Sequence, residues 1–367
     1  MTNFDIIKNF SADSDISEIL TRALDNEPLN VEDGVRLLKS NDLNLLGAGA
    51  DELRKRSAVE VVTFVVDRNI NYTNICSSKC RFCAFFREQD AKDAYVLTVG
   101  EIMAKIHEAV GMGATQILMQ GGLNPDIPID YYEDVLREAR KRFKIQMHAF
   151  SPPEIIHISK LYGCGIRETI SRLHEAGLDS IPGGGAEILD DRVRRSVSPN
   201  KIGWEKWRDV MLTAHSLGIP TTATMVFGHA ETLEERIMHI IRVRDMQEQY
   251  HGFTAFIPWS FQSENTQLQG ASTGIDYLKM VAVSRILLYG SINNIQASWV
   301  TQGLSIAQLA LNFGANDLGG TMIEENVVRA AGVAFHSKSI DEFLYIARKL
   351  GRPVARRDTL YNILELF

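Results

Sequence analysis

The segment Asn71-Tyr-Thr-Asn-Ile-Cys76-Ser-Ser-Lys-Cys80-Arg-Phe82-Cys83-Ala-Phe-Phe86 holds three of the four cysteines of this 367-residue chain. Three thiolates in a C-x3-C-x2-C loop can bind three irons of a cubane cluster, for which sulfur is the preferred ligand. The fourth iron is then left without a protein ligand, so a small molecule with an amine and a carboxylate can chelate it. The spacing therefore predicts a [4Fe–4S] cluster on Cys76, Cys80 and Cys83.

A zinc ion is the alternative occupant of such a loop. A closed zinc site takes four ligands, whereas no histidine lies near the loop and the remaining cysteine, Cys164, is far along the chain. We expect Cys164 to be a buried structural thiol. Clustered cysteines in a chain of this length indicate metal chemistry in a reducing compartment, so we expect a cytoplasmic protein.

Outward from the loop, short apolar runs alternate with longer amphipathic runs. Strands are expected at residues 61–68, 115–120, 144–150, 177–181, 220–227, 252–258, 294–299 and 310–314. Helices are expected between them, and two begin with capping boxes, Thr98 with Glu101 and Thr232 with Glu235. Eight strand–helix units predict a parallel sheet, and a (β/α)8 TIM-type barrel accounts for all of them, with an open doubly wound sheet as the alternative.

The two ends of the chain are predicted to be helical. Residues 1–60 form an N-terminal helical extension, with helices at 16–24, 31–38 and 43–57, packed on a barrel that spans residues 61–339. Residues 340–367 form a C-terminal helical cap. Because the cysteine loop follows the first strand, the cluster is expected at the C-terminal mouth of the barrel, where such folds place their active sites.

Composition excludes several classes of protein. Hydrophobic residues make up 45% of the chain, enough for a substantial core, and 39 basic against 46 acidic residues give a net charge of -7. A mildly acidic chain without a long basic block is a poor nucleic-acid binder. No apolar run approaches the ~18 residues of a membrane span, so we expect no membrane insertion. Residues 1–15 do not resemble a secretory signal.

The cysteine spacing, with the aromatic Phe82 just before the third cysteine, resembles the radical S-adenosylmethionine (SAM) superfamily. The resemblance implies that SAM binds the open iron and is cleaved to methionine and a 5′-deoxyadenosyl radical. It also implies that Phe82 packs beside the cluster and the adenine, and that Gly121-Gly122 bind the SAM amino group through backbone carbonyls. Glu187, in the Gly183–Glu187 turn, is placed to bind the SAM ribose or amine. Core packing for Phe82 and a solvated helix start for Glu187 are the alternatives.

Residues 69–76 resemble a radical SAM subgroup that contains the deazaflavin synthase subunits, the aminofutalosine synthases and the dehypoxanthine futalosine cyclases. Three later blocks, residues 256–266, 298–303 and 314–326, resemble the cyclases. This implies cyclisation of dehypoxanthine futalosine in menaquinone biosynthesis, by hydrogen abstraction from C4′, with flavodoxin or ferredoxin as electron donor. The substrate-binding residues implied are Trp259, Gln262, Asn265, Thr301, Gln302 and Asn316.

The cyclisation also needs a base to remove a proton from the aromatic ring. Asp317, Glu324 and His148 are candidates by position, since each can accept a proton near neutral pH if its environment tunes it. A hydrogen-bonded structural role is the alternative for His148. Another reaction of the same subgroup, or a non-catalytic iron–sulfur or zinc protein, remains the alternative for the whole chain.

Overall fold

The structure, a computed structural model, describes residues 16–57, 60–334 and 337–367. The first 15 residues, where the sequence predicts no secretory signal, lie outside the described part. The described helices are α2 (Ser17–Leu24), α3 (Val31–Lys39), α4 (Leu43–Arg56), α5 (Val99–Gly111), α6 (Asp130–Arg142), α7 (Pro152–Tyr162), α8 (Ile166–Ala176), α9 (Asp191–Val197), α10 (Trp204–Ser216), α11 (Leu233–Tyr250), α12 (Gly274–Leu287), α13 (Trp299–Ala310), α14 (Val327–Ala330) and α15 (Ile340–Arg348). The strands are β1 (Val62–Val65), β2 (Asp67–Ile70), β3 (Gln116–Met119), β4 (Gln146–Ala149), β5 (Thr221–Phe227), β6 (Phe253–Ser260), β7 (Asp317–Gly320), β8 (Val354–Arg357) and β9 (Ile363–Leu366).

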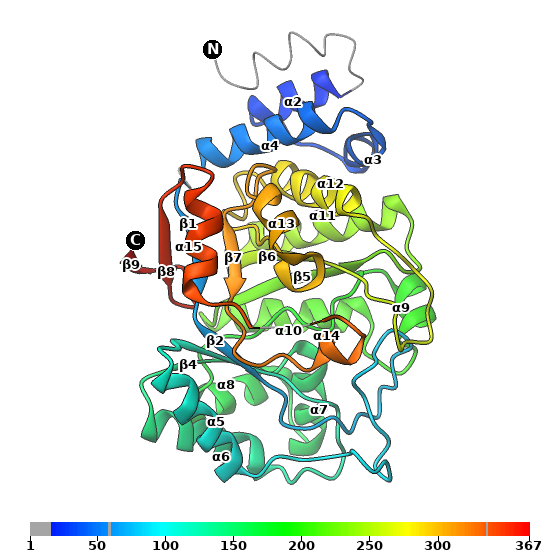
Figure 1. Cartoon of the computed structure of the whole chain (residues 1–367). Helices are drawn as coiled ribbons and strands as arrows, with labels where there is room; N and C mark the ends of the chain where they lie inside the picture. The colour runs from blue at the N-terminus through cyan, green and yellow to red at the C-terminus, as the bar shows by residue number, and fades with distance from the viewer. Residues whose placement is uncertain (1–15, 58–59, 335–336) are drawn as a thin grey trace.

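The N-terminal helices match the sequence prediction closely. The side chain of Asn30 accepts a hydrogen bond from the Asp33 amide, and the Asp33 carboxylate accepts one from the Asn30 amide, which fixes the start of α3. α4 packs on α12, and α3 packs on α11. Figure 1 shows these three helices in blue, together at one end of the molecule. They bury apolar faces against helices that follow β5 and β6, so they extend the core of the larger body.

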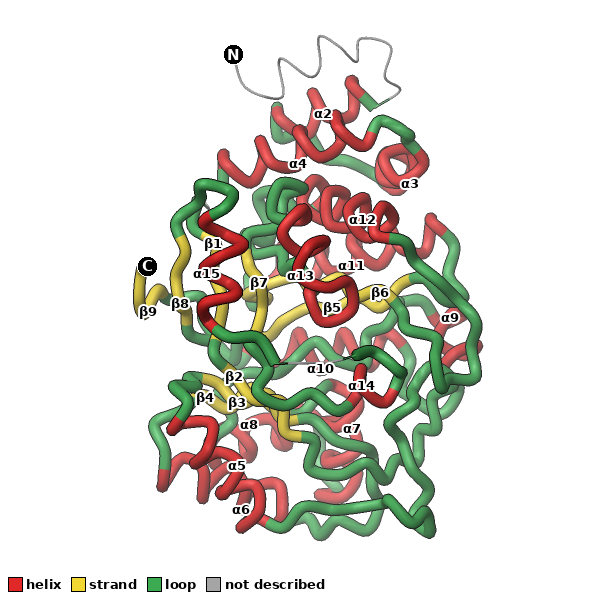
Figure 2. The backbone as a smooth tube through the Cα atoms, viewed as in Figure 1, coloured by secondary structure: helices red, strands yellow, loops and turns green. Residues whose placement is uncertain are grey.

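The strands form an α/β fold in which the pairing is parallel except at the C-terminus. β1 pairs with β7 and β8, β2 with β3, β3 with β4, and β5 with β6. Isolated parallel bridges link the remaining neighbours: His148 with Ser180, Ile181 with Thr221, Phe256 with Ile295, and Gln296 with Asp317. The succession runs from β2 round to β7, which pairs with β1. Figure 2 shows most of the strands in yellow in the interior with helices around them, and β8 and β9 at the left edge beside the C-terminus.

Four of the expected strands differ from the structure, and one of them, 294–299, contributes only the bridging residues Ile295 and Gln296 before α13 begins at Trp299. The run 61–68 is divided into β1 and β2, whereas 177–181 contributes only bridging residues. The strand expected at 310–314 is wrong. Those residues are the buried end of α13 and a turn at Gly314, and β7 begins at Asp317. A short apolar run has no period that separates a buried helix end from a strand.

The helical cap predicted for residues 340–367 is wrong in its second half. After α15 the chain turns at Gly351, where φ is +69°, and Val354–Arg357 becomes β8, parallel to β1. β9 then returns antiparallel to β8. Two adjacent arginines, Arg356 and Arg357, obscure this strand in the sequence, and Arg357 is buried only because it meets Asp317.

No helix in the described ranges combines the length and apolar character needed to cross a bilayer.

Candidate active site

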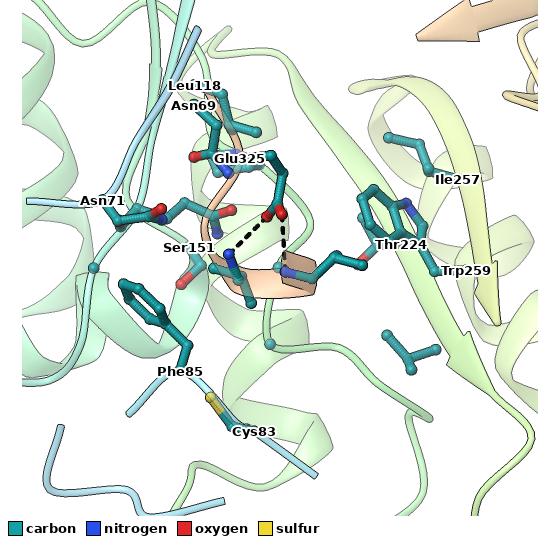
Figure 3. A pocket seen from close by; sticks show the side chains of 18 of the residues that line it. Asn69, Asn71, Cys83, Phe85, Leu118, Ser151, Thr224, Ile257, Trp259 and Glu325 are labelled. Atoms are coloured by element: carbon teal, nitrogen blue, oxygen red, sulfur yellow. Dashed lines mark hydrogen bonds between the residues drawn. The ribbon is translucent and has the colours of Figure 1, made fainter. Parts of the chain in front are cut away.

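One large cavity of about 410 Å³ is lined by the cysteine loop and by residues from most of the strands. Figure 3 shows Cys83 and Phe85 on one side of this cavity, and Ile257 and Trp259 on the other. Two groups of lining residues carry chemistry. We call Cys76, Cys80 and Cys83 the cysteine end, and we call Asp67, His148, Gln296, Arg357 and Tyr361 the polar cluster.

The cysteine end is held by local hydrogen bonds. The Arg87 guanidinium donates to the carbonyls of Ala84, Phe85 and Phe86, and the Leu123 amide donates to Cys76 Sγ at 3.3 Å. Burial raises the pKa of Cys80 to about 12, so a metal that binds it must displace a proton. These hydrogen bonds fix the backbone on both sides of the cysteines.

The cysteines fit a cluster better than a single ion. Within the described ranges, no three His, Cys, Asp or Glu side chains converge on a point where one metal ion can be held. A cubane places each thiolate on a different iron, so its three cysteines need not converge. Cys164 lies elsewhere, with its Sγ 3.3 Å from Thr169 Oγ1.

Gly121 and Gly122 join the cavity to the cysteine loop by close packing. A Cβ at Gly122 would lie 2.1 Å from the Ile75 carbonyl oxygen, and one at Gly121 would lie 2.6 Å from the Tyr72 ring. The Gly121 amide donates to Glu154 Oε1 at 2.9 Å. Both glycines line the cavity as the sequence predicts, and the structure adds that neighbouring protein atoms leave no room for a side chain.

Glu187 is buried and ion-paired, so it is not a solvated helix start. Its Oε1 lies 2.8 Å from Lys201 Nζ, and its Oε2 lies 3.2 Å from Arg194 Nη1. Burial alone would raise the pKa of Glu187, but Lys201 and Arg194 outweigh it and the pKa is lowered. Lys201 Nζ also lies 5.1 Å from the centre of the Phe82 ring. Lys201 lines the cavity and carried no signal in the sequence.

The residues expected to bind substrate divide into two groups. Trp259, Gln262 and Thr301 line the cavity, and Gln302 supports it by donating to Ser260 Oγ at 2.5 Å. Asn265 is exposed and donates to the Ala330 carbonyl at 3.1 Å.

Asn316 is fully buried away from the lining. Its Oδ1 accepts from Arg285 and from the Ile295 amide, both at 2.9 Å. Neither Asn265 nor Asn316 is placed to meet a ligand in this cavity.

Two of the three candidate bases are held elsewhere by ion pairs. Asp317 is fully buried and receives Arg357 Nε at 2.5 Å and Nη2 at 2.9 Å. Glu324 binds Lys105 and Arg68, and these partners lower its pKa although burial opposes them. Neither residue lines the cavity, so the structure does not support either as the base.

His148 does line the cavity, but as an uncharged group. Its Nδ1 lies 2.7 Å from Ser180 Oγ, and burial lowers its pKa to about 3. The imidazole is therefore neutral across the physiological range, in a hydrogen-bonded position.

Sequence reasoning missed several polar groups that the fold brings to the cavity. Asp67, Glu154, Glu325 and Arg357 line it, from four separate parts of the chain. Two buried oxygens that line it, Asn69 Oδ1 and Thr359 Oγ1, have no hydrogen-bond partner among the described residues. Buried polar atoms are nearly always paired, so these two are available to a ligand. No spacing in the sequence relates these positions.

Comparison with known proteins identifies the family. Residues 70–242 match the radical SAM superfamily, and residues 250–364 match the CofH/MqnC C-terminal region. The cyclic dehypoxanthine futalosine synthase of Halalkalibacterium halodurans is 47% identical over 356 residues, 96% of each chain. The enzyme of the same name from Streptomyces coelicolor is 39% identical and covers 96% of this chain and 89% of its own.

A second group of relatives carries a different name. The 5-amino-6-(D-ribitylamino)uracil–L-tyrosine 4-hydroxyphenyl transferase of Archaeoglobus fulgidus is 45% identical over 324 residues, 86% of this chain and 92% of its own. Identity alone does not separate the two groups, because the 45% of this transferase lies between the 47% and the 39% of the two cyclic dehypoxanthine futalosine synthases.

Solved structures agree on the fold. The [FeFe]-hydrogenase maturase HydG of Carboxydothermus hydrogenoformans superposes with a TM-score of 0.75 at 15% identity, over 98% of this chain and 83% of that one. Methylornithine synthase (PylB) gives a TM-score of 0.70 at 17% identity, over 90% and 95%. The sequence relatives and the cysteine loop together show that this chain belongs to the radical SAM superfamily, whose enzymes use a [4Fe–4S] cluster and SAM.

Proposed function

We propose that this protein cyclises dehypoxanthine futalosine to cyclic dehypoxanthine futalosine in menaquinone biosynthesis. Two relatives with that name cover 96% of the chain. The proposed substrate is a ribose joined through its 5′ end to a benzoate, so it needs both polar and aromatic contacts. The observation that carries the proposal is one cavity that is lined by the three cysteines, by Trp259 and by several Asn and Gln side chains.

We assign the cofactors to the cysteine end. Cys76, Cys80 and Cys83 would hold the cluster, while Phe82, Gly121, Gly122 and Glu187 would hold SAM. When bound, the pair supplies the radical that takes hydrogen from C4′ of the substrate. The chain's own residues bind and orient: Lys201 fixes the Glu187 carboxylate, and Glu154 fixes the Gly121 amide.

We assign the substrate to the opposite wall. Trp259 and Ile257 offer an apolar surface for the aryl ring. Asn69, Gln262 and Thr301 offer amides and a hydroxyl for the ribose, and the unpartnered Asn69 Oδ1 is suited to accept a bond from a sugar hydroxyl. Leaving such an acceptor unpaired is costly, so the site favours a ligand that supplies a donor.

Hydroxyphenyl transfer to 5-amino-6-(D-ribitylamino)uracil is the second candidate, since relatives with that name reach 45% identity. Against it, Trp259, Gln262 and Thr301 belong to the blocks that resemble the cyclases, and all three line the cavity. Aminofutalosine synthesis is a further reaction of the same subgroup, and the same blocks argue against it.

The deciding experiment is anaerobic incubation of the reconstituted enzyme with SAM, a reductant and each substrate set, read by mass spectrometry. We expect cyclic product and 5′-deoxyadenosine in a one-to-one ratio with dehypoxanthine futalosine. Deuterium at C4′ of that substrate should appear in the 5′-deoxyadenosine. Turnover only with tyrosine and the ribitylaminouracil would replace this proposal with the transferase.

The proposal extends to architecture and setting. We take residues 61–339 as a (β/α)8 barrel, with residues 1–60 as a helical extension and residues 340–367 as a cap of α15, β8 and β9. The unbroken succession of strand pairs and bridges from β2 to β7, and from β7 to β1, supports a closed barrel. We take flavodoxin or ferredoxin as the electron donor, the cytoplasm as the location, and no nucleic acid as a partner. The clustering of Cys76, Cys80 and Cys83 within eight residues supports a reducing setting.

A further inference from the structure

Four carboxylates line the cavity in the described part of the chain: Asp67, Glu154, Glu187 and Glu325. Cyclisation onto an aromatic ring releases a ring proton, so one nearby group must accept it. A general base needs a free oxygen that faces the substrate. The hydrogen bonds of the four carboxylates therefore decide which of them can act.

Three of the four are already occupied. Glu187 is held by two cations. Glu154 accepts from the Tyr72 hydroxyl and the Gly121 amide on one oxygen, and from the Ser151 amide and hydroxyl on the other. Glu325 accepts from the amides of α14 on both oxygens, and Figure 3 shows two dashed bonds at this carboxylate.

Asp67 differs from these three. Its Oδ1 accepts from the Met322 amide at 2.9 Å, and its own backbone amide also favours the charged carboxyl. Among the described residues no side chain donates a hydrogen bond to this carboxylate, which lines the cavity, and Oδ2 has no donor from another residue. The side chain is 2% exposed and lies against Gly320, where a Cβ would be 2.1 Å from Oδ1. A side chain at position 320 would therefore displace the carboxylate from its place in the cavity wall.

The surroundings of Asp67 raise the pKa of its carboxyl toward neutral pH. Burial raises its pKa to about 6, although the Met322 amide and Arg357 oppose the shift and Asp317 adds to it. The charged groups that face it are Arg357 from β8 and Asp317 from β7, which neutralise each other in their own ion pair. The titratable neighbours His148 and Tyr361 surround Arg357 and are uncharged near neutral pH.

We propose that Asp67 is the general base that removes the ring proton after the sugar radical has joined the aromatic ring; this rests on the proposed cyclisation. A bond forms between C4′ and a ring carbon, and that carbon's C–H bond then breaks. The proton passes to Asp67 Oδ2, and the odd electron would go to a one-electron oxidant, for which an oxidised iron–sulfur centre held by Cys76, Cys80 and Cys83 would serve. The ring regains its aromaticity, and atoms and electrons balance.

The test compares Asp67→Asn, Asp67→Glu and Glu108→Gln. Glu108 is an exposed partner of Arg68, the residue next to Asp67, so its variant controls for lost charge near the same strand. In Asp67→Asn, cyclic product should fall by about 10²–10⁴-fold, the usual effect of losing an acid–base catalyst, while 5′-deoxyadenosine continues to form. Asp67→Glu should restore part of the product, and Glu108→Gln should match the wild type.

The pH profile gives a second readout. Wild-type product formation should fall as the pH drops through about 6, because Asp67 becomes protonated. Asp67→Asn should lack this limb in its residual activity. 5′-Deoxyadenosine formation should show no such limb in either protein.

A third readout needs no cluster. The folded-state pKa of Asp67 lies above its unfolded value, so ionisation weakens the fold as the pH rises through about 6. In the full-length protein without iron, Asp67→Asn should therefore gain more in melting temperature over the wild type at pH 8 than at pH 5. An equal difference in melting temperature between the two proteins at both pH values would contradict a raised pKa of the Asp67 carboxyl.

The outcomes separate the two proposals. If wild-type enzyme makes no cyclic product, the proposed function fails. If the wild type makes it and Asp67→Asn does so at the same rate, Asp67 is not the base. If product and 5′-deoxyadenosine fall together in Asp67→Asn, Asp67 positions the substrate and the general-base proposal is overturned.

Discussion

The two groups of cavity residues, the cysteine end and the polar cluster, were built in different ways. The cysteine end comes from three residues within eight positions, and its spacing alone indicates what it binds. The polar cluster comes from residues between positions 67 and 361, drawn from strands, a bridge and the C-terminal turn. One group is encoded locally, whereas the other exists only after β8 has docked on β1. Substitutions in the two groups should therefore have different effects on cluster binding and on stability.

The largest effect should come from the cysteine end. Cys76→Ala, Cys80→Ala and Cys83→Ala should each abolish SAM cleavage, because each removes one of three thiolates and the loop has no spare. Wild-type protein reconstituted anaerobically should hold about four irons. Iron and sulfide analysis, with 5′-deoxyadenosine measurement, checks both statements. Cys164→Ala should retain cluster and cleavage, and stoichiometric zinc in anaerobically prepared wild type would refute the assignment.

The next effect tests whether the cysteine end depends on the turn that follows β3. Gly122→Ala places a Cβ 2.1 Å from the Ile75 carbonyl, which is backbone and cannot move without shifting the cysteine loop. The variant should fold but lose most of its iron after reconstitution. Gly111→Ala is the matched control, since a Cβ there meets nothing within 4 Å. Full iron occupancy in Gly122→Ala would mean that the loop tolerates displacement.

The polar cluster depends on Asp317, which lies outside the cavity lining but pairs with Arg357 of the cluster, and loss of this pair should reduce stability. Asp317→Ala leaves the Arg357 guanidinium buried without its partner, and breaking such a pair destabilises by about 3–5 kcal/mol. Denaturant unfolding measures this loss. The double variant Asp317→Leu with Arg357→Met should recover part of it, because no charge remains to be buried. A single variant as stable as the wild type would show that the pair does not anchor β8.

The smallest effect is expected at Glu324, which the sequence suggested as a base together with Asp317, whereas the structure favours Asp67. Glu324→Gln should leave cyclic product within about threefold of wild type, far from the 10²-fold or greater loss of a missing base. Its carboxylate lies outside the cavity lining and binds Lys105 and Arg68. Steady-state product assays decide this, and a loss as large as that of Asp67→Asn would return Glu324 to the active site.

The sequence by itself determined what depends on neighbours along the chain. Asn30 with Asp33, Thr98 with Glu101, and Thr232 with Glu235 each fix a helix start within one turn, and all three capping boxes are present. The last two of these capping boxes and the cysteine loop were available from spacing in the sequence, because hydrogen bonds and metal ligation within a few residues depend on the local chain. The radical SAM family followed from the same short loop.

Only the tertiary structure decided which carboxylate is free and which is paired. The sequence suggests Asp317 as a base, yet Arg357 of β8 donates two hydrogen bonds to it. The sequence analysis did not predict β8, because two adjacent arginines are unusual in a buried strand. Asp67 has no motif, yet it is buried in the cavity with one oxygen that accepts no hydrogen bond from another residue. A carboxylate's chemistry depends on its desolvation and on the charges that face it, and both are set by contacts between residues far apart in sequence.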